Sequence, residues 1–275
     1  MTLLFLVVGL GIALSLIMAL AWKVAVRTGR SGWIDAIWSF AVGGAGLVAS
    51  LVPVTQEEPR RRQLIVGAIV VIWSARLGLH IVCRTMGAGD DPRYAQLRED
   101  WGQDFRERLF WFLQGQAGAA FLLVCSILAA AQNPAPELRL GDWLGILVFV
   151  TALAGETLAD QQLARFRANA VNKDRVCDTG LWSFSRHPNY FFEWLGWLAY
   201  PLIGIDPTGQ YPWGWAALSG PAFIYWLLVH VSGVPPLEAH MLRSRGDAFR
   251  AYQARVNVLW PGPSRPSAAK GRRPA

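Results

Sequence analysis

A run of polar residues interrupts an otherwise apolar stretch, WSFSRHPNYFFEWLGW, at residues 182–197. Arg186, Asn189 and Glu193 are spaced so that they share one face of a helix. Pro188 fits the first turn of that helix, where free backbone N–H groups attract anions. These N–H groups and the neighbouring Arg186 guanidinium form a predicted anion site, and the Asn189 side chain offers a donor and an acceptor to an amide. The pattern predicts a binding site for a phosphorylated, amide-bearing molecule.

Two more polar stripes lie on apolar segments. A charge buried in mid-bilayer costs about 2.5–3.5 kcal/mol, so such residues indicate either helix pairing or a ligand site. Pairing of Arg76 with Asp35 or Glu193 would satisfy the first reading. Three stripes together favour a ligand site. Asp160 needs a partner such as a ribose hydroxyl, because its negative charge lies near a helix C-terminus and opposes the helix dipole. His187 is better placed than His230 to bind a ligand. The stripes are Glu156, Asp160 and Arg167, and Trp73, Arg76 and His80.

The elements that position these residues are predicted to be membrane helices. The chain is 53% hydrophobic and only 16% charged, against about 25% charged residues in soluble domains. Most Lys and Arg fall in alternate loops and the tail, which predicts an external N-terminus and a cytoplasmic tail. The fold class is therefore all-α, with seven transmembrane helices. Their predicted bounds are 3–22, 33–54, 64–83, 109–131, 141–160, 189–205 and 213–233.

Composition also limits the function classes. The net charge of +7 follows from the one-sided basic loops, which suit anionic lipids or a phosphate-bearing ligand, so no nucleic-acid partner is expected. The three cysteines lack metal-type spacing, and no metal is expected. The first span lacks the basic start of a signal peptide. Residues 1–260 are predicted to form one domain, followed by a disordered basic tail at 261–275. Gly43, Gly44 and Gly46 offer a surface for close helix packing.

Several segments resemble the steroid 5-alpha-reductase family over approximately residues 33–260. These are ADQQLARFR, LWSFSRHPNYFFEWLGW, SGVPPLEAH and RAYQARVNVLWP, and they are most similar to the bacterial and plant branch called DUF1295. The resemblance implies a seven-helix membrane enzyme that takes NADPH from the cytosol and reduces an activated carbon–carbon double bond of a lipid- or steroid-like enone. The cofactor contacts expected from the stripes and the resemblance are Arg93, Tyr94, Asp160, Arg165, Arg167, Arg186, His187, Asn189, Tyr190, Glu193, Glu238 and Tyr252.

The resemblance also implies an acid that polarises the substrate carbonyl. The match QEEP at 56–59 lies on the predicted external side, so we assign the role to Asp35 in WIDAIW. As a neutral acid with a raised pKa, Asp35 would donate a hydrogen bond to the substrate oxygen. The catalytic tyrosine of the animal enzymes is replaced here by Trp73. Either another donor such as His80 takes its place, or the substrate is not a 3-oxo-steroid.

Two alternatives remain open. The R-H-P-x-Y pattern also occurs in isoprenylcysteine and phospholipid methyltransferases, which use S-adenosylmethionine. Those enzymes often carry a pair of glutamates near the tail, whereas Glu238 stands alone here and Asn189 follows the proline, which favours a reductase. A non-enzymatic membrane protein that retains the fold is the third reading. The expected location is a bacterial inner membrane, or the endoplasmic reticulum in a eukaryote.

Overall fold

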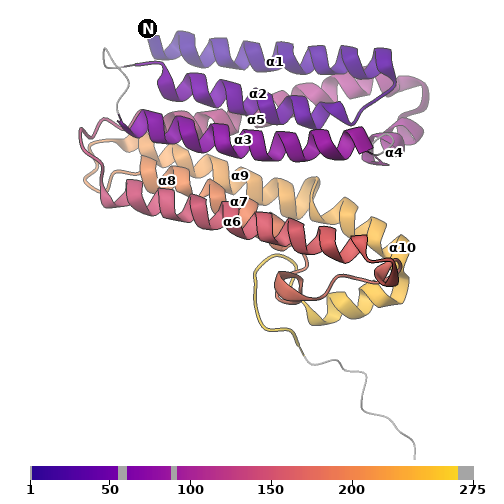
Figure 1. Ribbon diagram of the computed structural model, residues 1–275. Helices are drawn as coiled ribbons and strands as arrows, with labels where there is room; N and C mark the ends of the chain where they lie inside the picture. Colours follow the sequence, from indigo (N-terminus) through magenta and orange to yellow (C-terminus); the bar gives the residue numbers. More distant parts are fainter. Residues whose placement is uncertain (1, 55–60, 88–91, 266–275) are drawn as a thin grey trace, which may run out of the picture. The chain divides into compact units, whose positions relative to one another are not determined.

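Helices are the regular secondary structure of the described part of the chain. The computed structural model describes residues 2–54, 61–87 and 92–265, and every regular element in those ranges is a helix (Figure 1). The all-α prediction is confirmed. Two other predictions, the QEEP match at 56–59 and most of the basic tail, lie outside the described residues.

The α-helices and the shorter helical turns follow one another with brief connections. The α-helices are α1 (Thr2–Thr28), α2 (Trp33–Leu51), α3 (Arg61–Gly87), α4 (Pro92–Trp101), α5 (Phe105–Ala131), α6 (Leu140–Ala168), α7 (Pro188–Trp197), α8 (Ala199–Gly204), α9 (Ser219–Trp226) and α10 (Val234–Arg255). The 3-10 turns are η1 (Gly102–Asp104), η2 (Ala170–Asn172), η3 (Gly180–Ser183) and η4 (Pro212–Leu218), and η5 (Leu227–Val231) is a π-helix.

Among the described residues, six helical stretches are long and apolar enough to cross a membrane. This is consistent with a polytopic membrane protein. The count of seven spans and the external N-terminus stay predictions. The six stretches are Thr2–Thr28, Trp33–Leu51, Arg61–Met86, Arg93–Ala131, Leu140–Ala168 and Pro212–Arg255.

The predicted sixth span, 189–205, is divided between two short helices. α7 ends at Trp197 and α8 begins at Ala199, with Leu198 between them. Pro201 has no N–H to donate to the carbonyl of Trp197, and its ring crowds that carbonyl. The proline therefore accounts for the interruption, which hydropathy alone did not indicate.

The chain divides into two compact units, which we describe separately. Unit 1 comprises Met1–Ile146 and Leu198–Phe223. In it α1, α2 and α3 run side by side, and α5 packs on α1 and α2 (Figure 1). A Cβ on Gly43 would lie 2.1 Å from the Ser74 hydroxyl, and one on Gly46 would lie 2.8 Å from Ile127, whereas Gly44 faces open space. Close packing is thus confirmed for Gly43 and Gly46 but not for Gly44.

A buried ion pair fixes one end of unit 1. The Arg62 guanidinium donates to both oxygens of Asp142, at 2.7 and 2.8 Å. It also donates to the backbone carbonyls of Asn133, Ala135 and Glu137, which follow α5. Arg62 is 2% exposed and Asp142 is fully buried. One guanidinium thus joins the starts of α3 and α6 to the segment after α5. The sequence analysis attached no role to either residue.

Unit 2 comprises Leu147–Trp197 and Ile224–Ala275. α6 and α7 approach closely at glycines, because a Cβ on Gly155 would lie 2.3 Å from the Phe192 ring and one on Gly196 would lie 3.5 Å from Ala152. α10 bends at Gly246, whose φ of 50° falls in the left-handed region that favours glycine.

The segment after α10 lies along the chain that leads into α7. The Arg186 N–H donates to the carbonyl of Asn257 at 2.9 Å, and the Gly262 N–H donates to that of Phe184 at 3.0 Å. The Tyr252 hydroxyl donates to the carbonyl of Trp182 at 2.6 Å. These bonds fix the backbone on which the residues of the RHPNY segment sit.

Candidate functional site

Asp35 lies in a compact polar cluster of unit 1, formed with the first residues of α4. Its side chain is 19% exposed and stands in the first turn of α2. The Arg93 guanidinium donates to Oδ2, and the Tyr94 hydroxyl donates to Oδ1 at 3.1 Å. Tyr94 is 2% exposed. The cluster therefore combines a carboxylate, a paired guanidinium and a buried phenol.

A second polar group reaches the same phenol from α5. The side chain of Gln116 lies beside the Tyr94 hydroxyl. The Oε1 atom of Gln116 is buried and has no hydrogen-bond partner within the described parts of the chain. Buried amide oxygens are usually hydrogen-bonded. An unsatisfied acceptor beside Tyr94 is what a site that awaits a polar ligand would present.

The contacts of Asp35 do not test its predicted role as a carbonyl-polarising acid. Asp35 accepts from both of its partners, whereas the predicted chemistry had it donate a hydrogen bond as a neutral acid. The Tyr94 hydroxyl has one proton, which it donates to Asp35 in this structure, so a ligand would receive that proton only when the phenol turns away from Asp35. The sequence analysis placed Arg93 and Tyr94 at the cofactor, and nothing in the structure tests that placement. Trp73 is buried on α3, and His80 is exposed on the same helix.

In unit 2 the Arg186 guanidinium is occupied by protein groups. It donates to the two oxygens of Glu238, at 2.7 and 3.2 Å, and to the carbonyls of Gln253 and Val256, at 3.2 and 2.6 Å. The side chain is only 8% exposed. Its predicted role as an anion ligand stays untested, and these contacts give it a different one, which is to tie the chain before α7 to α10.

His187 lies in the same cluster and retains one unsatisfied nitrogen. Its Nε2 is 3.0 Å from an oxygen of Glu238, and its ring stacks on Tyr190 with centroids 5.3 Å apart. The Nδ1 atom is buried and has no hydrogen-bond partner among the residues described. A carboxylate accepts hydrogen bonds, so Nε2 carries the proton in a neutral ring and Nδ1 is left as an acceptor. A hydroxyl or amide N–H of a ligand would satisfy it.

The polar faces of α6 and α7 lie within unit 2, at different degrees of burial. Glu156 and Glu193 are buried, and Glu193 accepts from the Trp197 indole N–H at 2.9 Å. Asp160 and Asn189 are half-buried. Arg165 and Arg167, in the last turns of α6, are exposed. Tyr252 is buried and its hydroxyl bonds to backbone.

Metal-ligand clustering is absent from the described ranges: no three His, Cys, Asp or Glu side chains lie close enough there to hold an ion. The donor set in unit 2 consists instead of carboxylates, an amide, an imidazole and exposed guanidinium groups. These are groups that bind the hydroxyls, amide and phosphates of a nucleotide.

Comparison with known proteins places the chain in a family. The sequence resembles an uncharacterized protein of Schizosaccharomyces pombe. The two are 25% identical over 277 aligned positions, which cover 91% of this chain and 78% of the relative. No solved structure matches the chain. A sequence model of the family described as "Protein of unknown function (DUF1295)" matches residues 21–256. Because that match covers most of the chain, the protein belongs to the DUF1295 family.

Proposed function

We propose that the protein is an NADPH-dependent membrane reductase of an activated carbon–carbon double bond in a lipid-like enone. The resemblance to the steroid 5-alpha-reductase family motivates the proposal. The observation that supports it most directly is the buried Tyr94 hydroxyl, which is hydrogen-bonded to Asp35. A buried phenol beside a paired carboxylate is a donor suited to a substrate carbonyl.

In this proposal Tyr94 takes the part of the tyrosine that is missing at Trp73. The phenol O–H donates to the carbonyl oxygen and stabilises the negative charge that develops there during reduction. Asp35 acts as a positioning residue that holds the phenol at rest. Its own charge stays compensated when the phenol turns to the substrate, because Arg93 is bonded to its other oxygen.

The polar groups of unit 2 fit a dinucleotide by their chemistry. Bound NADPH would supply the hydride for the reduction. Arg165 and Arg167 are exposed and available to phosphate groups. Asp160 would accept from a ribose hydroxyl, and Asn189 would pair with a carboxamide. The buried Nδ1 of His187 is an acceptor whose partner is missing from the described residues, and a ligand N–H or O–H would meet that need.

Ligand-induced stabilisation tests the cofactor. A ligand that binds the folded protein raises its apparent melting temperature by mass action. We expect purified protein in detergent to be stabilised by NADPH more than by NADH, and not by S-adenosylmethionine. The Asn189→Ala variant should need more NADPH for the same rise. Stabilisation by S-adenosylmethionine alone would replace the reductase with a methyltransferase.

The Tyr94→Phe variant tests the carbonyl donor. Loss of one preorganised donor lowers turnover by about 100-fold or more. We expect that loss in NADPH oxidation with a 3-oxo-4-ene steroid or a long-chain enone as substrate, and no loss of stabilisation by NADPH. Tyr211→Phe is the matched control, because the Tyr211 hydroxyl also donates to a carbonyl in unit 1, that of Ala129, at 3.1 Å. Undiminished turnover in Tyr94→Phe would remove Tyr94 from the chemistry.

A further inference from the structure

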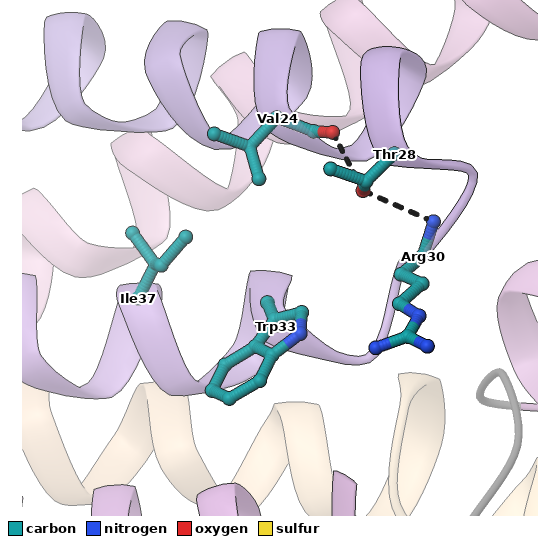
Figure 2. Close-up of a pocket in the computed structure, with 5 residues that line it drawn as sticks. All are labelled: Val24, Thr28, Arg30, Trp33 and Ile37. Atoms are coloured by element: carbon teal, nitrogen blue, oxygen red, sulfur yellow. Dashed lines mark hydrogen bonds between the residues drawn. The ribbon is translucent and has the colours of Figure 1, made fainter. Parts of the chain in front are cut away.

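A hollow opens in unit 1 where α1 ends and α2 begins. It has a volume of about 420 Å³, and Figure 2 shows the side chains that line it. Val24, Trp33 and Ile37 form apolar walls, and Thr28 and Arg30 add polar groups at the turn. Asp35 does not line this hollow, so the hollow is distinct from the cluster around Tyr94.

The turn that carries Arg30 is fixed by hydrogen bonds. The Thr28 hydroxyl donates to the carbonyl of Val24 at 2.8 Å and accepts from the Arg30 backbone N–H at 3.2 Å (Figure 2). Gly29 has a φ of 70°, which lets the chain reverse there. Its carbonyl accepts from the Arg98 guanidinium of α4 at 3.3 Å. The backbone beneath Arg30 is thus held from both sides.

The Arg30 side chain itself is exposed, and its guanidinium makes no hydrogen bond or ion pair with the described residues. Lys23 and Arg27, in the last turns of α1, are also exposed but do not line the hollow. The 27 residues of α1 include no Asp or Glu. The mouth of the hollow is therefore a positive site with no acidic partner on α1, and it complements an anion.

An apolar stripe on α1 winds around the helix by about 40° at each step of four residues and reaches the hollow. It consists of side chains that are each at least half exposed and spaced four residues apart: Val8 (50%), Ile12 (56%), Leu16 (65%) and Leu20 (60%). The next steps of four reach Val24 and then Thr28, which both line the hollow. Val8 and Val24 are about 24 Å apart along the helix axis, so the stripe exceeds the roughly 15 Å of one hydrocarbon leaflet.

We propose that this hollow binds an anionic phospholipid of the surrounding membrane. An acyl chain lies along the α1 stripe and enters between Val24 and Ile37, and the Arg30 guanidinium binds the phosphate by charge-assisted hydrogen bonds. Trp33 lines the hollow at the start of α2, and indole rings favour the membrane interface. This site is independent of the proposed reductase activity, because none of its residues belongs to the Asp35 cluster or to the unit 2 donor set.

Native mass spectrometry of the purified full-length protein tests the site. Palmitoyl-oleoyl phosphatidylglycerol and the corresponding phosphatidylcholine are titrated into detergent micelles, and the first bound lipid is counted. We expect phosphatidylglycerol to bind more tightly than phosphatidylcholine. Arg30→Gln should weaken phosphatidylglycerol binding about five-fold, the effect of one basic residue at a membrane surface. Arg27→Gln removes the same charge outside the hollow, and its effect should stay below about two-fold because solvent and salt screen it.

A second variant tests the apolar part of the site and does not depend on how Arg30→Gln folds. Val24→Trp fills the hollow and keeps every charge. It should reduce phosphatidylglycerol binding as Arg30→Gln does, while size-exclusion chromatography shows an unchanged elution volume. Equal binding of the two lipids to the unmodified protein would overturn the proposal. So would equal losses in Arg30→Gln and Arg27→Gln, or full binding in a folded Val24→Trp.

Discussion

The ion pair between Arg62 and Asp142 allows a quantitative prediction of stability. Arg62→Met keeps the aliphatic volume of the side chain and removes its donors. The change strands a fully buried carboxylate and leaves three carbonyls of the 133–137 segment without the guanidinium. Breaking a buried pair by removing one partner costs about 3–5 kcal/mol.

The lower end of that range applies, because Asp142 keeps other donors. The Arg139 backbone N–H donates to its Oδ2 at 2.6 Å, and the Arg139 Nε lies 3.9 Å from the same oxygen. We therefore expect a loss of about 3 kcal/mol. In a chain of this size that corresponds to a fall of about 6–12 °C in melting temperature.

The measurement is thermal unfolding of the purified protein in one detergent, followed by intrinsic fluorescence. Arg108→Met is the matched control, because Arg108 and Asp104 are also paired, at 3.4 Å, but are 57% and 66% exposed. A surface pair of that kind contributes less than about 1 kcal/mol. Adding Asp142→Asn to Arg62→Met should recover part of the loss, since it removes the stranded charge. Equal falls for Arg62→Met and Arg108→Met would refute the reasoning.

Two further predictions concern unit 2. Gly155→Ala should lower the melting temperature, because the new methyl would lie 2.3 Å from the Phe192 ring and overpacking costs about 1–3 kcal/mol. The control is Gly118→Ala, whose methyl meets no atom within 4 Å and should be neutral or stabilising. The same change in melting temperature at both glycines would contradict the close approach of α6 and α7. Burial raises the pKa of the Cys177 thiol, which lowers its thiolate fraction near neutral pH. In variants that keep a single cysteine, maleimide should therefore label the exposed Cys83 faster than Cys177. Faster labelling of Cys177 would show that this thiol is not buried.

Helical structure could be read from the sequence because apolar periodicity reports directly on helices. Each long helix of unit 1 begins or ends near a predicted boundary. The division of 189–205 into two helices has a local cause, since the effect of Pro201 on the carbonyl of Trp197 concerns one backbone hydrogen bond and barely changes hydropathy. Hydropathy also gave no sign of the π-helix at Leu227–Val231, which depends on backbone geometry alone.

The polar clusters were harder to predict, because their members come from distant segments. Asp35 was selected for its place in α2, and Tyr94 for its likeness to a family loop, but their direct contact spans 59 positions of sequence. Helical spacing predicted one helix for Arg186, Asn189 and Glu193, but α7 begins at Pro188, so Arg186 lies in the segment that precedes it. Spacing within one helix carries no information about Glu238, which lies on α10 and engages Arg186 through both carboxylate oxygens.

Arg62 and Arg186 show why an arginine in an apolar setting is an ambiguous signal. Each guanidinium spans both oxygens of one carboxylate and also donates to backbone carbonyls at or beyond the end of a helix. A guanidinium has five N–H donors, so such contacts consume most of its capacity. In the proposed reductase this leaves the exposed Arg165 and Arg167 to recognise phosphate. Arg186 then acts indirectly, because it fixes Glu238 in place. Glu238 in turn contacts the Nε2 atom of His187, and the Nδ1 atom is left as the open acceptor.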